Sequence, residues 1–216
     1  RAYLAFAGGL EVKPVLGSRS TDLRSRFGGV EGRALRAGDR LALAPSEGAA
    51  AGWLSPTLRR TAIAHVAPEA PLPILPGRHL GHFTADAFQL LCDSRWRVSR
   101  DADRAGIRLD GPPLHHVGQP EVPSVGLPLG AVQVPRDGRP IVMLVDRPVT
   151  GGYPVVGCLG RAAVGRAAQL LPGDEVRFAP VTAAQAREEL RNLDALLRDG
   201  VRSQDDPGPA WAGALD

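Results

Sequence analysis

Residues 141–154 read IVMLVDRPVTGGYP, and this stretch decides the fold because it joins an apolar run to a dense group of polar residues. The apolar residues 141–145 do not alternate with polar ones, which is typical of a strand covered on both faces. The chain changes from apolar to polar residues at Asp146. We therefore expect a buried strand whose C-terminal end places polar side chains at the surface.

The polar residues after this strand are candidates for catalysis. Guanidinium and carboxylate groups can fix or polarise a small substrate, while a hydroxyl and a phenol donate hydrogen bonds. The catalytic candidates are Asp146, Arg147, Thr150 and Tyr153. Gly151 and Gly152 are candidate substrate-binding residues, because backbone N–H groups can approach a ligand where no Cβ intervenes. A tight turn with a surface ion pair is the simpler interpretation, and the stretch alone leaves both open.

The preceding residues predict a partner strand. Residues 130–135 (GAVQVP) form a short apolar strand around Gln133, and the turn sequence RDGRP leads from it into the strand at 141. This pattern predicts a hairpin. Gln133 is therefore a candidate substrate-binding residue on the neighbouring strand.

A second polar segment, DADRAGIRL at 101–109, places acids and arginines before and within a strand expected at 106–110. Asp103, Arg104 and Arg108 are candidate substrate-binding residues here, since arginines can clamp a phosphate or carboxylate through two parallel hydrogen bonds. A salt-bridged surface turn is the alternative interpretation.

The composition favours a mostly β protein. The chain has 216 residues, of which 44% are hydrophobic and only 5% aromatic, with 26 glycines and 20 prolines. Abundant turn residues indicate many short strands. The net charge of +3 comes from scattered arginines and a single lysine, which argues against a nucleic-acid partner.

We expect no membrane span and no signal peptide, so the expected location is the cytoplasm. Because the chain begins at Arg1, we expect an N-terminal piece of a longer protein to be missing.

Cysteines and histidines do not predict a metal site. Cys92 and Cys158 are far apart in sequence and are expected to be small buried hydrophobic residues. The pairs His79/His82 and His115/His116 lack the third and fourth ligands that a metal centre needs. We therefore predict no metal, and ordinary loop histidines.

Two blocks of sequence recur in the same order. Residues 2–17 (AYLAFAGGLEVKPVLG) resemble residues 141–157, and residues 35–43 (LRAGDRLAL) resemble residues 170–178 (LLPGDEVRF). The repeat predicts a duplicated β unit and indicates that both Gly-Gly pairs are structural turns. The polar groups after 145 belong to one copy only.

Three helices are expected between and after these blocks. Thr84 can cap a helix that contains Ala85, Phe88 and Leu91, residues 161–171 form a second, and a third begins at Thr182. The domain prediction is a remnant of a first β barrel at 1–70, a second barrel at 71–199 and a flexible tail at 200–216.

Several strings together resemble the family of allophanate hydrolase subunit 2, which includes the C subunit of 5-oxoprolinase, KipA-type proteins and the carboxyltransferase region of urea carboxylase. The resemblance departs from the family pattern at Pro148-Val149, at Val155 and at Ala105 and Ile107. The matching strings are AYLAFAGG, VLGSRST, GRALRAGD, DRAGIRLDG, GAVQVPRDGRPIV and DRPVTGGYP.

The resemblance implies duplicated cyclophilin-like β barrels and a subunit-1 type (KipI-like) partner. Its first functional implication is an ATP-dependent 5-oxoprolinase, with ATP and Mg as co-substrate, that activates a small lactam amide for hydrolysis to glutamate. A biotin-dependent carboxyltransferase or allophanate hydrolase-type subunit acting on urea or another small amide is the alternative, with biotin carried by another protein. A non-enzymatic antagonist of a kinase-inhibitor protein is the third.

Overall fold

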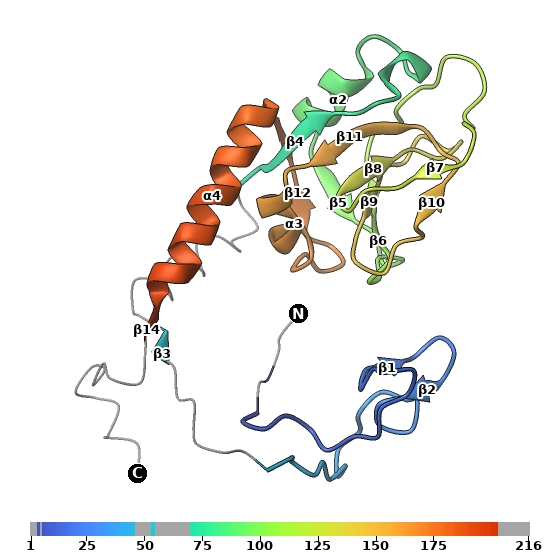
Figure 1. The fold of residues 1–216 in the computed structure, drawn as a ribbon. Coiled ribbons are helices and arrows are strands. Elements are labelled where there is room, and N and C mark those ends of the chain that lie inside the picture. The colour runs from blue at the N-terminus through green and yellow to red at the C-terminus, as the bar shows by residue number, and fades with distance from the viewer. Residues whose placement is uncertain (1–3, 5, 46–52, 55–69, 203–216) are drawn as a thin grey trace. The chain divides into compact units, whose positions relative to one another are not determined.

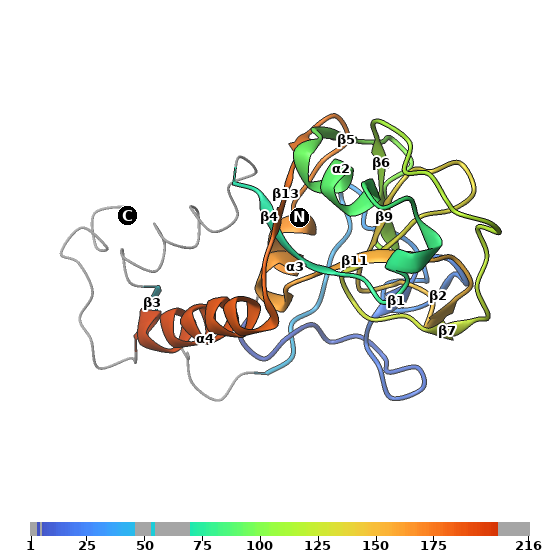
Figure 2. The same cartoon turned by 90° about the horizontal axis from the view of Figure 1, so that it is seen from above.

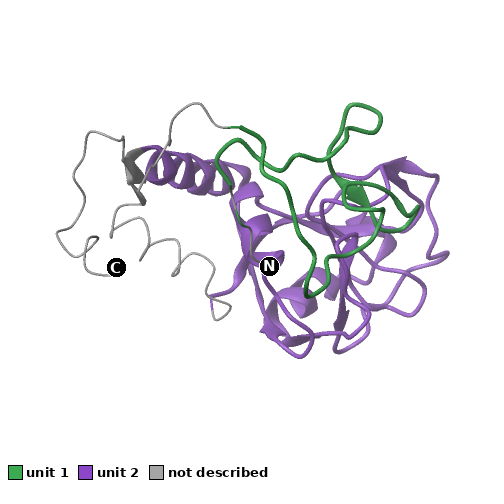
Figure 3. Cartoon of the chain, turned by 90° about the horizontal axis from the view of Figure 1, so that it is seen from below, with its two compact units in different colours: residues 1–53, 203–216 green, residues 54–202 purple. Residues whose placement is uncertain are grey.

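The computed structural model describes residue 4 and residues 6–45, 53–54 and 70–202 of the chain. The chain divides into two compact units, residues 1–53 with 203–216 and residues 54–202 (Figure 3). Every candidate site residue predicted from the sequence lies in the second unit.

The described part of the first unit has little regular structure. Its strands β1 (Thr21–Asp22) and β2 (Phe27–Gly28) form an antiparallel pair. Isolated antiparallel bridges join Leu10 to Leu43 and Val15 to Ser18. β3 (Trp53–Leu54) lies at the division between the units. The described residues of this unit therefore do not form a barrel.

One half of the predicted repeat is confirmed as local geometry. The Arg36 N–H donates to the Asp39 carboxylate at 2.8 Å, and the Asp39 N–H donates back to the Arg36 carbonyl at 3.1 Å. Leu171 and Asp174 make the same two bonds at 2.7 and 3.0 Å. The third residue of each turn is a glycine with φ near +90°, a left-handed conformation that favours glycine.

The other half of the repeat is not equivalent in structure. Gly8 and Gly9 have φ of 75° and 74°, whereas Gly151 and Gly152 are not in the left-handed region. Gly151 belongs instead to strand β10 (Thr150–Gly151). The prediction that both Gly-Gly pairs form matching turns is therefore wrong.

The second unit is built on one eight-stranded sheet (Figure 1). Neighbouring strands are antiparallel except for the last two, which are parallel. In spatial order the strands are β12 (Glu175–Val176), β5 (Trp96–Val98), β6 (Gly106–Asp110), β9 (Ile141–Met143), β8 (Ala131–Gln133), β11 (Val155–Leu159), β4 (Leu72–Pro76) and β13 (Phe178–Pro180).

The two edges of this sheet are brought together by the chain itself. β12 and β13 lie at opposite edges, yet only Arg177 separates them in sequence. The end of β12 and the start of β13 can therefore be at most about 7 Å apart, so the sheet must curl until its edges meet. The Arg177 carbonyl also accepts a hydrogen bond from the Leu72 N–H at 2.8 Å. The sheet is therefore nearly closed and barrel-like, which confirms the prediction of a mostly β fold.

Apolar residues fill the inside of the curved sheet. Trp96, the largest fully buried side chain, donates from its indole Nε1–H to the Leu91 carbonyl at 2.9 Å, so its one polar atom is satisfied. On β6, Ile107 and Leu109 are buried while Arg108 is exposed, as the alternation of a strand requires. The strand predicted at 106–110 is confirmed with these bounds.

β8 and β9 are buried on both faces. Val132 and Val142 belong to the inner core, and a second apolar cluster lies on the outer face. Its members are Leu127, Ala131, Ile141, Met143 and Val155. The predicted hairpin and the predicted two-sided burial of the strand from 141 are both confirmed.

The helices lie around this sheet. α2 (Ala87–Asp93) contacts β13 and β11 (Figure 2), and η1 (Leu80–His82) precedes it. α3 (Arg161–Ala167) contacts β4 and α4 (Ala183–Gly200). In the part of the chain that the structure describes, no helix combines the length and apolar character needed to cross a bilayer.

The helix ends differ in how well the sequence predicted them. α4 begins as predicted: the Thr182 hydroxyl accepts the Gln185 N–H at 3.3 Å, and the Gln185 side chain accepts the Thr182 N–H at 2.8 Å. α2 begins later than predicted, at Ala87 with Asp86 as its N-cap residue. The Thr84 side chain hydrogen-bonds the Asp86 carboxylate and lowers its pKa. α3 ends before the predicted limit of 171. Gly200 closes α4 and Val201–Arg202 form β14, so only residues 203–216 of the predicted tail lie outside the described residues.

The alternation on β6 gives the first testable prediction. Leu109→Ala removes a side chain that is 1% exposed, and we expect it to lower the free energy of unfolding by about 2–5 kcal/mol. Arg108→Ala, one residue away on the exposed face, should change it by less than about 0.5 kcal/mol. Urea denaturation of both variants measures this difference, and equal losses would contradict the strand assignment.

Candidate functional site

One row of residues crosses the outer face of four neighbouring strands. Cα pairing joins Arg108 to Ile141, Ile141 to Gln133, and Gln133 to Val155. Residues directly opposite each other in antiparallel strands project to the same face. The structure therefore places two predicted substrate-binding residues, Arg108 and Gln133, in one row with an isoleucine between them.

Gln133 is the one polar residue in the buried class among the described residues, with 3% of its surface exposed. Its side-chain Nε2 donates to the Tyr153 carbonyl at 3.1 Å. A Cβ added to Gly151 would lie 2.6 Å from that nitrogen. A buried amide is stable only when it is hydrogen-bonded, so Gln133 anchors the backbone of Tyr153, and a side chain at position 151 would have to displace that amide.

Residues 122–127 and 147–152 form a two-stranded ribbon beside the outer cluster, called here the outer ribbon. β10 pairs with β7 (Val125–Gly126), and the Leu127 N–H donates to the Val149 carbonyl at 2.9 Å. Val122 bonds the Gly152 carbonyl at 2.8 Å. Leu127 is also part of the outer apolar cluster. The ribbon is therefore fixed at both ends, and it holds Gly151 and Gly152 as backbone elements.

Arg147 supports this ribbon. Its Nε donates to the Leu127 carbonyl at 2.8 Å, and its Nη1 lies 3.5 Å from the Leu144 carbonyl. Arg147 is therefore held by backbone carbonyls.

Asp146 pairs with Arg104. The guanidinium meets the carboxylate in a fork, with Nε to Oδ2 at 2.8 Å and Nη2 to Oδ1 at 3.2 Å. The backbone supports the pair, because the Asp146 N–H donates to the Arg104 carbonyl at 3.1 Å. The side chains are 63% and 46% exposed, so the pair contributes at most about 1 kcal/mol and can open for a ligand.

Asp103 has a local structural role. Its carboxylate accepts the N–H groups of Ala105 at 2.8 Å and Gly106 at 3.0 Å, and these bonds shape the turn that leads into β6. The turn positions Arg104 beside the end of β9. Of the two alternatives for this segment, a salt-bridged surface turn describes its geometry.

Thr150 and Tyr153 are exposed. Thr150 lies opposite Gly126 in the ribbon, and Tyr153 is 41% exposed. Their hydroxyl groups are donors that a ligand can reach. The surface near them thus combines two hydroxyls with backbone groups that Gln133 and the ribbon hold in place.

Two histidine rings contact backbone groups that could not be identified from the sequence. His79 Nδ1 accepts a hydrogen bond from the Val155 N–H at 3.1 Å, and His116 Nε2 lies 3.1 Å from the Val134 carbonyl. No group of three or more His, Cys, Asp or Glu side chains within the described ranges is placed to hold a metal. Burial raises the pKa of the Cys92 thiol to about 11, so this cysteine is a poor nucleophile.

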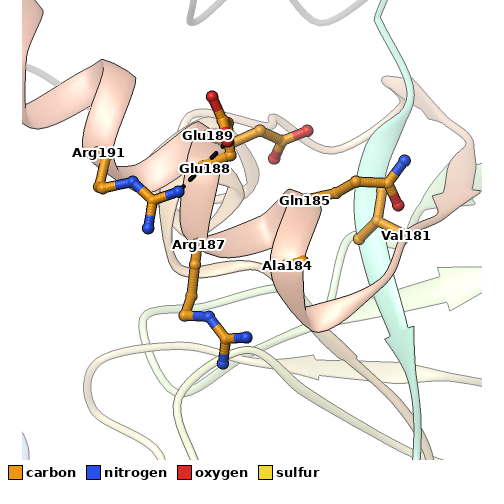
Figure 4. Close-up of a pocket in the computed structure, with 7 residues that line it drawn as sticks. All are labelled: Val181, Ala184, Gln185, Arg187, Glu188, Glu189 and Arg191. Carbon is orange, nitrogen blue, oxygen red and sulfur yellow. Dashed lines mark hydrogen bonds and ion pairs between the residues drawn. The ribbon is translucent and has the colours of Figure 1, made fainter.

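Hollows in the described surface lie away from the predicted residues. One of about 540 Å³ surrounds the start of α4 (Figure 4), where Arg191 and Glu188 form an ion pair at 3.2 Å. A second, of about 450 Å³, lies between α3 and α4, and a third, of about 470 Å³, contains His115 and Arg136. None of these three is lined by a predicted catalytic residue, so the candidate site is an exposed face.

The sequence and fold together define the class of the protein. Residues 1–180 match the family model of the carboxyltransferase domain, subdomain A and B, and the chain belongs to this family. The crystal structure of Kluyveromyces lactis urea carboxylase superposes with a TM-score of 0.67 at 23% identity, over 90% of this chain and 20% of that one. This likeness concerns the fold.

Within the family, the chain is similar to the C subunit of 5-oxoprolinase. It is 36% identical to the Escherichia coli protein over 186 residues, which is 86% of this chain and 58% of that protein. The Haemophilus influenzae protein is 32% identical over 93% of this chain and 62% of its own length. The urea amidolyase of Saccharomyces cerevisiae is 27% identical over 94% of this chain and 12% of that protein. The chain thus spans about three-fifths of the length of the two 5-oxoprolinase relatives.

The contact between Gly151 and Gln133 gives the second prediction. Gly151→Ala would push the buried amide away from the Tyr153 carbonyl, and we expect the free energy of unfolding to fall by about 1–3 kcal/mol. Gly126→Ala is the matched control, because a Cβ there meets nothing within 4 Å. Thermal unfolding measures both variants, and an unchanged Gly151→Ala would show that the amide is not confined.

Proposed function

We propose that the chain is part of a subunit of an ATP-dependent 5-oxoprolinase. The observation that carries this proposal is the 36% identity to the C subunit of Escherichia coli 5-oxoprolinase over 86% of the chain. In the proposed reaction, the lactam amide is activated with ATP and Mg as co-substrate and is then hydrolysed to glutamate. A subunit-1 type protein is the proposed partner.

The exposed arginines are the proposed anion-binding groups. Phosphoryl transfer depends on cations that offset the charge on the transferring phosphate. Arg104 can turn from Asp146 to a phosphate at little cost, because an exposed ion pair is weak. Arg108 is exposed on the row that contains Gln133. Asp146, once released, is free to accept a proton.

The ribbon residues are the proposed amide-binding groups. Thr150 and Tyr153 can donate to the carbonyl oxygen of the lactam as negative charge develops on it. Gln133 is assigned a supporting role, because its Nε2 already donates to the Tyr153 carbonyl. Arg147 holds the ribbon through its bond to the Leu127 carbonyl, and Gly151 holds it through its pairing with Val125.

A second candidate function is a biotin-dependent carboxyl transfer to urea or another small amide. The family match and the 27% identity to Saccharomyces cerevisiae urea amidolyase favour it. The same exposed face would then bring carboxybiotin, carried by another protein, close to the amide. Dependence of the reaction on a biotinylated carrier distinguishes this candidate from the first.

The third prediction tests the first candidate. The protein that contains this chain, mixed with its subunit partners, 5-oxoproline, ATP and Mg, should produce glutamate and ADP together. Arg104→Ala should lower kcat/KM roughly ten- to hundred-fold, the value of one charge-assisted hydrogen bond. Coupled assays for ADP and glutamate measure both.

Arg139→Ala is the matched control for this variant. Arg139 forms a similarly exposed ion pair with Asp110, at 3.0 Å, on the same sheet. We expect kcat/KM to stay within about two-fold of wild type, because removal of a surface ion pair by itself has little effect. The absence of substrate-dependent ADP from the wild-type complex would rule out the oxoprolinase, and equal losses in both variants would remove Arg104 from the site.

A further inference from the structure

The backbone from Tyr153 to Val155 is fixed by two side chains from distant parts of the chain. Gln133 Nε2 donates to the Tyr153 carbonyl at 3.1 Å, and the Val155 N–H donates to His79 Nδ1 at 3.1 Å. Val134 and His79 supply backbone N–H groups to the Pro154 and Val155 carbonyls at 3.0 and 3.2 Å. The exposed phenol of Tyr153 is therefore carried by a clamped segment.

His79 can hold Val155 only in one chemical form. A ring nitrogen that accepts a hydrogen bond has no proton, so the Nδ1 must be bare and the Nε2 protonated in the neutral ring. Protonation of Nδ1 would turn it into a donor facing the Val155 N–H. The bond would then be lost and replaced by repulsion.

The surroundings of His79 determine which form prevails. Two basic residues lie close to it in sequence, Arg78 and His82. The His82 ring lies edge-on to the His79 ring, with the two ring centroids 5.7 Å apart. β11, the strand that it bonds, has no charged side chain, and the nearby side chain of β8 is the neutral amide of Gln133. Among the described residues, the groups that shift the pKa of His79 include no carboxylate that would stabilise a charged ring.

We propose that His79 is a positioning residue that acts as a proton-operated latch on the Tyr153 segment. In the neutral form it holds Val155 and keeps the phenol in place. In the protonated form the Val155 N–H loses its acceptor, while the Gln133 side chain and the backbone bonds to the Pro154 and Val155 carbonyls remain. The hydrogen bond between His79 and Val155 exists whatever the protein catalyses, whereas its effect on catalysis rests on the proposed function.

The direction of the pH dependence follows from the electrostatics. Burial and the two neighbouring basic groups lower the pKa of His79 below its ordinary value, so folding favours the neutral ring. The stabilisation by the latch is complete above the unfolded-state pKa, about 6.5. This stabilisation declines as the pH falls below 6.5, and it is lost once the pH has passed the lower pKa that His79 has in the folded protein.

The fourth prediction is read from the latch itself by NMR of the full chain. At pH 7.5 the ¹⁵N shifts of His79 should show a bare Nδ1 and a protonated Nε2. The protection factor of the Val155 amide, corrected for intrinsic exchange, should fall by about ten-fold, the equivalent of one hydrogen bond, as the pH is lowered from 7.5 until the same spectra show His79 protonated. A proton on Nδ1 at pH 7.5, or constant Val155 protection, would overturn the proposal.

Three variants separate the latch from general effects on folding. His79→Asn keeps an acceptor, Oδ1, close to the position of Nδ1 but does not titrate, so Val155 protection should persist at the pH at which His79 is protonated in wild type. His79→Phe keeps a ring without an acceptor and should lose protection at every pH. His115→Asn, the matched control, removes an exposed imidazole that is not among the groups shifting the pKa of His79, and it should behave as wild type. If His79→Phe retains wild-type protection at pH 7.5, the latch does not exist.

Activity of the complex then tests the two proposals separately. If the oxoprolinase reaction occurs, KM should rise in wild type as the pH falls through the lowered folded-state pKa of His79, and it should stay flatter in His79→Asn. An active complex with an unchanged Val155 amide would reject the latch alone. An inactive complex with a pH-dependent Val155 amide would reject the proposed function alone.

Discussion

The two-sided burial of β8 and β9 is the constraint on which the rest of the structure depends. Val132 and Val142 face the interior of the barrel-like sheet, while Ala131, Ile141 and Met143 face the outer cluster. A surface so apolar on both sides requires a cover on each, since exposed apolar area costs about 25 cal/mol per Å². Curling of the sheet covers one side, and the segments that carry the outer ribbon cover the other.

The candidate site is a consequence of that outer cover. The ribbon contributes Leu127 to the cluster. It is fixed by the bond from Arg147 to the Leu127 carbonyl and, just beyond its end, by the bond from the Gln133 amide to the Tyr153 carbonyl. Hydroxyl groups of Thr150 and Tyr153 remain at its surface. Residues that the sequence nominated for catalysis thus divide into two kinds. Some hold the ribbon, and others face solvent where a substrate or partner can reach them.

Much of the framework could be predicted from local sequence. The apolar run from 141, the alternation at 106–110, the turn between Gln133 and Ile141 and the Thr182 cap each follow from short-range preferences, and each is confirmed. The partners of the polar side chains could not be predicted. Arg104 meets Asp146 across 42 positions and His79 meets Val155 across 76, because strand register, and not sequence distance, sets these neighbours.

Local sequence was enough to predict which strands are buried, where several turns fall, and that polar side chains gather after residue 145, since these features depend on hydrophobic pattern and backbone preference within a few residues. The pairing of Asp146 with Arg104, the hold of Arg147 on backbone carbonyls, and the close approach of Gly151 to a buried amide emerge only in the folded chain. These pairings arise when the sheet curls and brings distant segments together. A side chain acquires its role from that neighbourhood, because hydrogen bonds and ion pairs act only over a few ångströms.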